Sequence, residues 1–172
     1  ACILEESNKV SFTNKCAPSI VLVYVGTYKV NGIEHSNTFD FSLFSVTSIV
    51  RGCVRMQNPQ YSKSKNAVPL IHTTNLQKGK LVKLKRIIPG QNILVNGNGV
   101  VIPRVCNPNP NKIVLLDEKT IYALSDCVIV LHTPTKNDAE RLRDGIIEHW
   151  CDFVGVYKGT GAQYTTLERL KT

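Results

Sequence analysis

The chain has 172 residues, a formal net charge of +8, and a composition that is 42% hydrophobic and 20% charged. This size and balance fit one soluble folded domain that buries its own core, and they exclude a disordered chain. The longest apolar run, residues 20–25, is far shorter than the roughly 18 residues of a membrane span, so we expect no membrane partner.

The first 40 residues are predicted to contain strands. Residues 20–25 are mostly β-branched, as in a strand inside a sheet, and the Asn-Gly pair at 31–32 is a hairpin signal. Two glutamates at 5–6 stand where a secretory signal peptide would have its apolar core, so we expect no such signal. Because the chain begins with Ala1 and has a single methionine, Met56, we expect it to be a piece of a longer polypeptide.

Residues 39–66 lead into the main part of the fold. The spacing of Phe41, Phe44 and Ile49 favours a short helix, although the alternation over 39–43 would also suit a strand. The Arg-Gly pair at 51–52 ends this element. Residues 57–66 form a polar loop without periodicity, which we expect to be mobile unless a ligand binds it.

Short apolar runs bounded by Gly, Pro and Asn dominate the centre of the chain. Such runs are typical of a small, tightly turned sheet. We therefore predict an α+β domain in which a twisted, mainly antiparallel sheet over about residues 68–131 is covered by one packed helix. The predicted strands are 68–76, 81–88, 93–95, 100–105, 113–116 and 127–131.

One helix is predicted over about residues 138–152. Asn137 is the expected N-cap, since Glu140 follows it at capping-box spacing. An apolar stripe with a period near 3.6 indicates a helix packed on the sheet. A second capping pattern, Thr165 with Glu168, predicts the start of another helix at the end of the sequence. The residues of the stripe are Ala139, Leu142, Ile146, Trp150 and Phe153.

Six cysteines are spread along the chain without a CxxC pair. Zinc and redox motifs use closely spaced pairs, so we expect no metal. Reduced and mostly buried thiols are the simplest expectation.

Positive charge is concentrated in the middle of the chain. Between Asp40 and Asp117 there is no acidic residue, although this stretch carries eleven basic ones. This segregation favours a surface that faces a polyanion over a solvated basic face without a partner. The basic residues are Arg51, Arg55, Lys63, Lys65, Lys78, Lys80, Lys83, Lys85, Arg86, Arg104 and Lys112.

No motif in the chain predicts catalysis. The Gly-rich turns at 96–99 and 159–161 lack the spacing of dinucleotide and P-loop motifs, and 107–111 lacks the aromatic residue of a methyltransferase Asn-Pro-Pro-aromatic loop. The four histidines show no ligand spacing. A Ser/His/Asp set would have to come from scattered residues that the sequence does not bring together.

The order of short motifs from Ser45 to Lys171 resembles that of target recognition domains. These domains belong to DNA methyltransferases and to the specificity subunits of type I restriction enzymes. Residues 1–40 look like the last strands of an adenine-type methyltransferase catalytic domain. The motifs that carry the resemblance are SVTSIVRG (45–52), VPLIHTTNLQKGKL (68–81), GQNILVNGNGVVIPRV (90–105), ALSDCVIVL (123–131) and GTGAQYTTLERLK (159–171).

The resemblance implies that residues 41–172 recognise specific sequences in double-stranded DNA. Catalysis and S-adenosylmethionine would then belong to another domain or subunit, with no cofactor in this chain. The partners expected are duplex DNA and the methyltransferase catalytic part. The location expected is the cytoplasm, beside the nucleoid of a bacterium or in the host of a phage or virus.

The expected DNA contacts divide into base readout and phosphate binding. Polar side chains of the 57–66 loop would read bases, while isolated positive charges would bind phosphates. For base readout we expect Gln57, Asn58, Gln60, Tyr61, Lys63 and Lys65, with Arg51 and Arg55 at the entrance of the loop. For the DNA backbone we expect Lys78, Lys80, Lys83 and Lys85, with Lys158 and Tyr164 near the closing turn; Arg86 and Arg104 are further expected DNA-binding residues.

Two other functions are also compatible with the sequence. One is a stand-alone nuclease or transferase acting on nucleic acid, with carboxylates from Asp117, Glu118 and Asp126. The other is an RNA-binding or structural protein of a virus or phage, which would prefer single-stranded RNA to duplex DNA.

Overall fold

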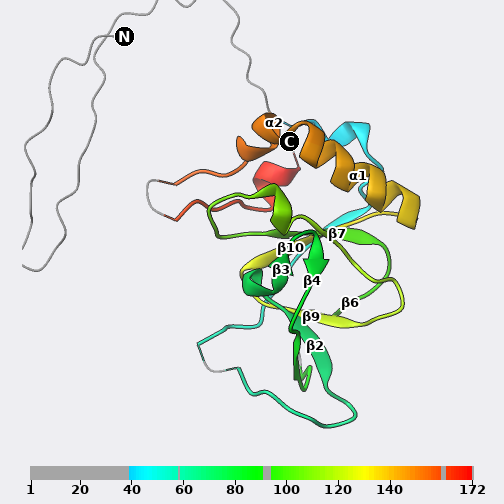
Figure 1. Ribbon diagram of the computed structural model, residues 1–172, viewed down its shortest axis with the longest axis vertical. Coiled ribbons are helices and arrows are strands. Elements are labelled where there is room, and N and C mark those ends of the chain that lie inside the picture. Colours follow the sequence, from blue (N-terminus) through cyan, green and yellow to red (C-terminus); the bar gives the residue numbers. More distant parts are fainter. Residues whose placement is uncertain (1–38, 58, 91–93, 160–161, 172) are drawn as a thin grey trace, which may run out of the picture. The chain divides into compact units, whose positions relative to one another are not determined.

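The computed structural model describes residues 39–57, 59–90, 94–159 and 162–171 (Figure 1). They belong to the second of two units into which the chain divides, Asn37–Thr172. The strands predicted before residue 39 therefore lie outside the described residues. So do three residues with a predicted role: Asn58, Cys2 and Cys16.

Two four-stranded sheets form the centre of the domain. Sheet 1 has the order β1-β10-β7-β8 and is antiparallel throughout. Sheet 2 has the order β5-β2-β9-β6, and its central pair β2–β9 is parallel. The strands of sheet 1 are β1 (Ser48–Arg51), β10 (Val128–His132), β7 (Gly99–Pro103) and β8 (Val114–Leu115). Those of sheet 2 are β5 (Lys85–Ile87), β2 (Val68–Ile71), β9 (Tyr122–Leu124) and β6 (Leu94–Val95).

In the described part of the chain, a short hairpin and six helical segments accompany the two sheets. The hairpin consists of β3 (Leu76–Gln77) and β4 (Lys80–Leu81), which pair antiparallel. The helices are α1 (Lys136–Glu148) and α2 (Trp150–Val154). The 3₁₀ segments are η1 (Phe41–Leu43), η2 (Thr73–Asn75), η3 (Pro110–Lys112) and η4 (Glu168–Leu170).

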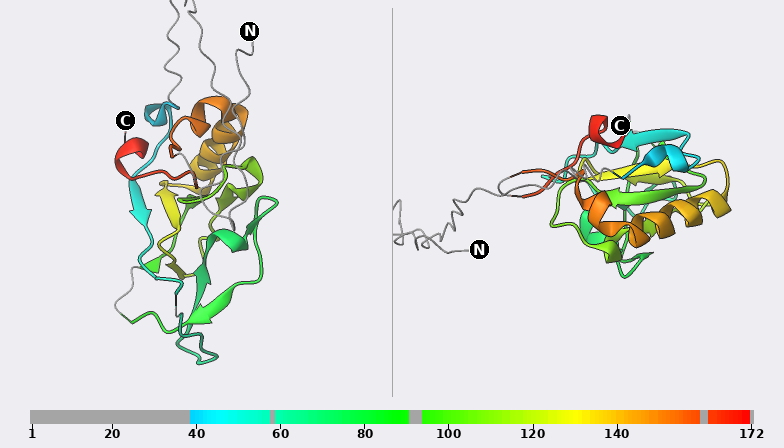
Figure 2. Two further views of the ribbon diagram at one scale, coloured as in Figure 1. Left: turned by 90° about the vertical axis from the view of Figure 1, so that its left-hand side faces the viewer. Right: turned by 90° about the horizontal axis from the view of Figure 1, so that it is seen from above.

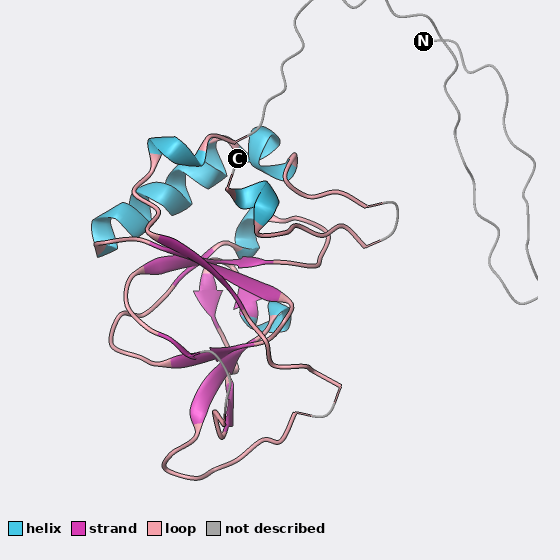
Figure 3. Cartoon of the chain, turned by 180° about the vertical axis from the view of Figure 1, so that it is seen from behind, coloured by secondary structure: helices cyan, strands magenta, loops and turns pink. Residues whose placement is uncertain are grey.

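The predicted α+β class with mainly antiparallel strands is confirmed, but the single predicted sheet is wrong. Alternate residues of β7 and β10 enter two different cores, because sheet 1 is covered on both sides. Val100 and Ile129 pack under α1, whereas Val101 and Val130 face sheet 2. Figure 3 shows the resulting order of helices, strands and a second layer of strands.

Helix α1 lies along the outer face of sheet 1 (Figure 2). Its side chains Leu142 and Ile146 are completely buried. At Gly145 the helix comes so close to Phe44 that an added Cβ would lie 2.3 Å from the ring. The ring of Phe44 stacks on Phe39 with centroids 5.4 Å apart. The predicted packed helix is thus confirmed. Residues before β1 also pack against this helix, through the contact of Phe44 with Gly145.

Both predicted helix caps are wrong by a short distance. The N-cap of α1 is Thr135, whose Oγ1 accepts a hydrogen bond from the N–H of Asp138 (3.1 Å), and Asn137 lies inside the helix. Near the end of the chain, the N-cap of η4 is Leu167, which makes no side-chain cap hydrogen bond; Thr166 accepts from the N–H of Arg169 (3.4 Å), while Thr165 is buried. Capping depends on backbone direction, which residue spacing alone does not specify.

Several predicted strands are shorter than expected. The run 68–76 turns into η2 after Ile71, and the run 81–88 is interrupted at Lys83, which has a left-handed backbone (φ 51°). The helix expected over 39–50 is limited to η1, and Ile49 lies in β1 instead. The predicted helix 138–152 is divided at His149. Ile49 pairs with Leu131 of β10, and the carbonyl of Ile71 accepts a hydrogen bond from the N–H of Ser125, so at these two positions pairing with distant segments overrides the local pattern.

The expectation of mostly buried cysteines is also wrong for the residues that the structure describes. Cys53 and Cys151 are exposed, and Cys106 and Cys127 are half-buried. Burial raises the pKa of the Cys106 and Cys127 thiols, so they are less reactive than an exposed thiol.

Thr135→Ala should lower the free energy of unfolding by about 1 kcal/mol, because it removes the N-cap of α1. Asn137→Ala is the matched control and should have little effect, since Asn137 is exposed inside the helix. Chemical denaturation followed by circular dichroism measures both values. Equal losses in the two variants would contradict the assignment of the cap.

Candidate nucleic-acid interface

The β3–β4 hairpin presents lysines on a tight turn. Lys78 (φ 49°) and Gly79 (φ 72°) both have left-handed backbones, as the two central residues of a type I′ turn require. The N–H of Gly79 donates a hydrogen bond to the carbonyl of Asn111 (2.8 Å), which ties the turn to η3. Lys78 and Lys80 are exposed, so their ammonium groups are available to a ligand.

Asn75 holds the backbone around Lys83. Its Oδ1 accepts from the N–H of His72 (2.9 Å), and its Nδ2 donates to the carbonyls of Val82 (3.0 Å) and Lys83 (3.2 Å). A left-handed conformation is costly for lysine because its Cβ crowds the backbone. The two hydrogen bonds from Asn75 Nδ2 compensate for this cost and fix the point from which Lys83 projects, and the bond from His72 holds the amide in place.

A pocket of about 290 Å³ lies beside this region. Tyr61 is held at its wall by a bridge to Ile87 and by the hydrogen bond from Ser62 N–H to Arg86 O (2.9 Å). The Nζ of Lys85 lies 4.5 Å from the centroid of the Tyr61 ring, a cation–π contact. The lining residues are Met56, Tyr61, Leu70, His72, Thr74, Asn75, Gln77, Lys83 and Lys85.

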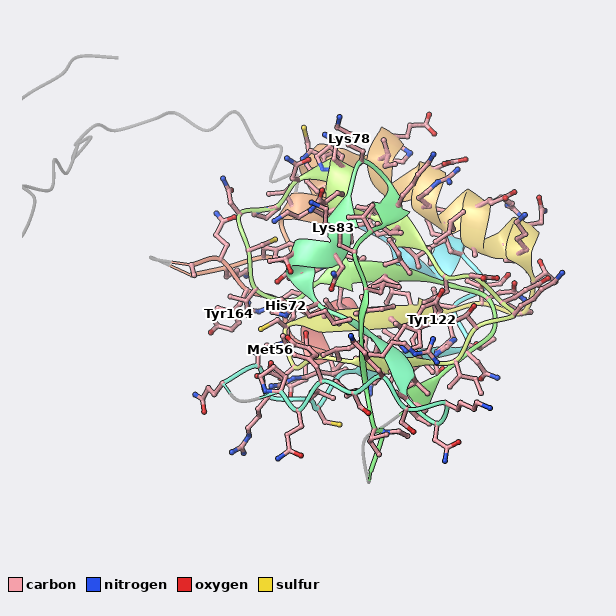
Figure 4. All side chains as sticks on the ribbon, turned by 60° about the horizontal axis from the view of Figure 1, so that its bottom comes forward. Met56, His72, Lys78, Lys83, Tyr122 and Tyr164 are labelled. Atoms are coloured by element: carbon pink, nitrogen blue, oxygen red, sulfur yellow. The ribbon has the colours of Figure 1, made fainter. Side chains whose placement is uncertain are left out.

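The positive charges around this pocket are not neutralised within the described part of the chain. Its two ion pairs, Lys136–Glu140 and Arg143–Asp144, both lie on or within α1. The lysines of the hairpin and of β5 therefore have no carboxylate partner there. In Figure 4, Lys78, Lys83, His72 and Met56 follow one another along one side of the molecule. We call this side, with Lys80 and Lys85, the basic face.

His72 joins the pocket to the interior of the domain. Its Nδ1 lies 2.9 Å from the Oγ of Ser125, and the carboxylate of Asp126 is close enough to act on its charge. Burial lowers the pKa of His72 below the ordinary value of 6.5, and Asp126 partly opposes this. The structure thus brings Ser125, His72 and Asp126 together. Ser125 is fully buried, so its hydroxyl is closed to a substrate and the group is structural.

The predicted DNA-binding residues fall into three groups in the structure. Tyr61, Lys83 and Lys85 meet at the pocket, with Lys78 and Lys80 on the adjoining hairpin. A second group is exposed on or before the polar loop, away from the pocket lining: Arg51, Arg55, Gln57, Gln60, Lys63 and Lys65. A third group has partners inside the protein: Arg86, Arg104, Lys158 and Tyr164.

The third group makes contacts that support the fold. The guanidinium of Arg86 donates to the carbonyl of Ala67, and Arg104 Nε donates to the carbonyl of Asp126 (2.6 Å). Lys158 and Tyr164 form a bridge with each other, and Arg169 lies 5.0 Å from the Tyr164 ring. These residues therefore stabilise turns in addition to any contact with a ligand.

The sequence predicted a binding role for only three of the nine residues that line the pocket, and it missed the other six. These six are Met56, Leu70, His72, Thr74, Asn75 and Gln77, and all except Met56 lie in the stretch VPLIHTTNLQKGKL, which was used only for the resemblance. Their signal in the sequence is the polar stretch HTTN at 72–75, which interrupts the apolar strand predicted over 68–76. That interruption marks the turn in which Asn75 makes its hydrogen bonds.

The carboxylates considered for a nuclease do not converge. Asp117 and Glu118 precede β9, whereas Asp126 follows it, so the strand separates them. Hydrogen bonds from the backbone of Lys119 and from Thr120 lower the pKa of Asp117, which is typical of a turn carboxylate. Within the described ranges, no group of three His, Cys, Asp or Glu side chains is placed to hold a metal ion.

Comparisons with known proteins leave the function to be argued from these residues. No family model matches the chain, and no curated protein is significantly similar to it. Among the helices that the structure describes, none combines the length and the apolar character needed to cross a bilayer.

Lys83→Gly should raise the free energy of unfolding by about 0.5–1 kcal/mol. Relief of the left-handed conformation outweighs the greater flexibility of glycine in the unfolded chain. Lys85→Gly is the matched control, because the same change in a strand should lower it by about 0.5–1 kcal/mol. Denaturant titrations measure both variants. If both variants lost the same free energy of unfolding, the backbone strain assigned to Lys83 would be contradicted.

Stability should fall as the pH drops below 6.5, in part because of His72. Since its pKa is lowered on folding, the unfolded chain binds more protons between the lowered pKa and 6.5. Above 6.5 the residue has no effect on pH dependence, and below it the folded state loses stability. His72→Gln should remove this contribution, as measured by denaturation at about pH 7.5 and about pH 5.5. An unchanged pH dependence in the variant would contradict the role of His72.

Proposed function

We propose that this chain recognises specific sequences in double-stranded DNA. In this proposal it serves a DNA methyltransferase or restriction–modification enzyme, and catalysis resides on another domain or subunit. The observation that carries it is the basic face, where Lys78, Lys80, Lys83 and Lys85 have no described carboxylate partner. Closely spaced cations of this kind bind a phosphate backbone and release its counterions.

The backbone geometry supports phosphate binding at defined positions. Lys78 and Lys83 project from left-handed residues, one held by the turn and one by Asn75. Lysine is a poor choice for such positions on grounds of stability. Its presence at both positions is consistent with a requirement for charge at these points, as in sites that accept strain for function.

The polar loop offers side chains that can read bases. Gln57 and Gln60 are exposed amides, and Lys63 and Lys65 are exposed donors. Amides pair with adenine and lysine pairs with guanine in the major groove. The bridge between Tyr61 and Ile87 anchors the loop to β5, so the loop and the basic face keep a defined relation.

The order of sequence motifs extends the proposal to a biological setting. The motifs of residues 45–171 resemble those of target recognition domains, whose parent enzymes use S-adenosylmethionine. That cofactor would bind to the catalytic domain or subunit that is the protein partner of this chain. The setting proposed is the bacterial cytoplasm beside the nucleoid, or the host cell of a phage or virus.

Duplex affinity should fall steeply with salt concentration, and Lys80→Ala should reduce the slope by about 1 while weakening all sequences equally. Gln57→Ala should instead relax sequence preference, costing roughly 1–3 kcal/mol on the preferred site. Competition binding with randomised duplexes at several salt concentrations measures both effects.

Arg141→Ala is a control of equal charge, because Arg141 is an exposed residue of α1, outside the basic face. It should change neither affinity nor preference. Salt-independent binding, or a preference for single-stranded RNA over duplex DNA, would contradict the proposed function.

A further inference from the structure

The pocket of the basic face has properties that phosphate binding does not need. Phosphate contacts require positive charge on an open surface. Here the side chains of Met56 and Leu70 add apolar surface, and an aromatic ring is held in place at the wall. Leu70 is 2% exposed and belongs to a core cluster, so this part of the lining is rigid.

The aromatic ring of Tyr61 is exposed to solvent, although its backbone is fixed. It is 45% exposed although its main chain is paired with β5. An exposed ring on an anchored backbone is a suitable platform for a planar group. The ammonium of Lys85 lies over one face of the ring, 4.5 Å from its centroid, so a base would stack on the opposite face.

The volume limits what the pocket can take. About 290 Å³ is at the lower end of the range for small-molecule sites, roughly 300–1,000 Å³. A paired duplex cannot enter a hollow of this size, whereas one nucleotide can. The neighbouring Gln77 donates Nε2 to the carbonyl of Thr74 (2.8 Å), which leaves its Oε1 to accept a hydrogen bond from the edge of a base.

We propose that this pocket binds a single unpaired nucleotide of a DNA strand. The base stacks on Tyr61 and contacts Met56, while the phosphate is bound by Lys83 and Lys85. Asn75 is a positioning residue, because it sets the left-handed backbone from which Lys83 projects. The inference rests on the proposed function, which supplies the DNA. It adds a site for a nucleotide that is not paired with the opposite strand.

Three duplexes of one sequence test the proposal with the full chain. The first is fully paired, the second has one extra unpaired nucleotide, and the third has an abasic nucleotide at the same point. Fluorescence anisotropy should show about tenfold tighter binding of the second duplex than of the other two, a factor in the range of base–aromatic stacking.

Substitution of Tyr61 separates stacking from charge. Tyr61→Ala should abolish the preference for the unpaired nucleotide, and Tyr61→Phe should keep it, because the ring remains. Lys78→Ala should weaken binding of all three duplexes by the same factor, since Lys78 lies on the hairpin and does not line the pocket. Thermal melting checks that each variant is folded.

The outcomes distinguish this inference from the function on which it rests. Equal affinity for the paired and unpaired duplexes would overturn the nucleotide site while leaving duplex recognition in place. Equal affinity for the unpaired and abasic duplexes would also overturn it, because the base would then contribute nothing. Binding of a single strand that depends on Tyr61, without binding of paired duplex, would support the site and overturn the proposed function.

Discussion

The rest of the structure depends on the burial of both faces of sheet 1. Strands β7 and β10 pair over five residues, and no residue between Val128 and Leu131 is exposed to solvent. A sheet of this kind needs an apolar cover on each side. Helix α1 and the segment before β1 supply one cover, and sheet 2 supplies the other.

Sheet 2 connects the core to the basic face. Its parallel pair β2–β9 leaves β5 as an outer strand, so that Lys85 lies opposite Leu70. The same outer strand pairs with Tyr61, which brings the polar loop back to the sheet. Three segments distant in sequence thus surround one pocket, and the core residue Leu70 forms part of its lining.

Two lysines of the basic face have strained backbone conformations, which set the positions of their charges. The hairpin turn and the break before β5 place two lysines in left-handed conformations, where glycine or asparagine would be more stable. At the second of these points the Nδ2 of Asn75 donates to the carbonyls of Val82 and Lys83, while its Oδ1 accepts from the N–H of His72. By contrast, Asp117 and Glu118 lie before β9 and Asp126 after it, and Asp117 accepts the hydrogen bonds of a turn. In the described part of the chain, the lysines of this face thus stand at fixed backbone positions, and these carboxylates do not come together.

The sequence by itself determined the α+β class, the packed helix and the basic stretch, because these follow from local periodicity and from composition. The apolar stripe of Leu142 and Ile146 needs only the helical period to be recognised. Only the tertiary structure decided that there are two sheets, since the apolar runs of β7 and β10 look alike whether they face one core or two. The same holds for the pocket: Tyr61, His72 and Lys85 come together through strand pairings, and the shift of the helix cap to Thr135 depends on the direction in which the chain leaves β10. These features depend on hydrogen bonds between segments distant in sequence, and the spacing of residues within one segment does not predict such bonds.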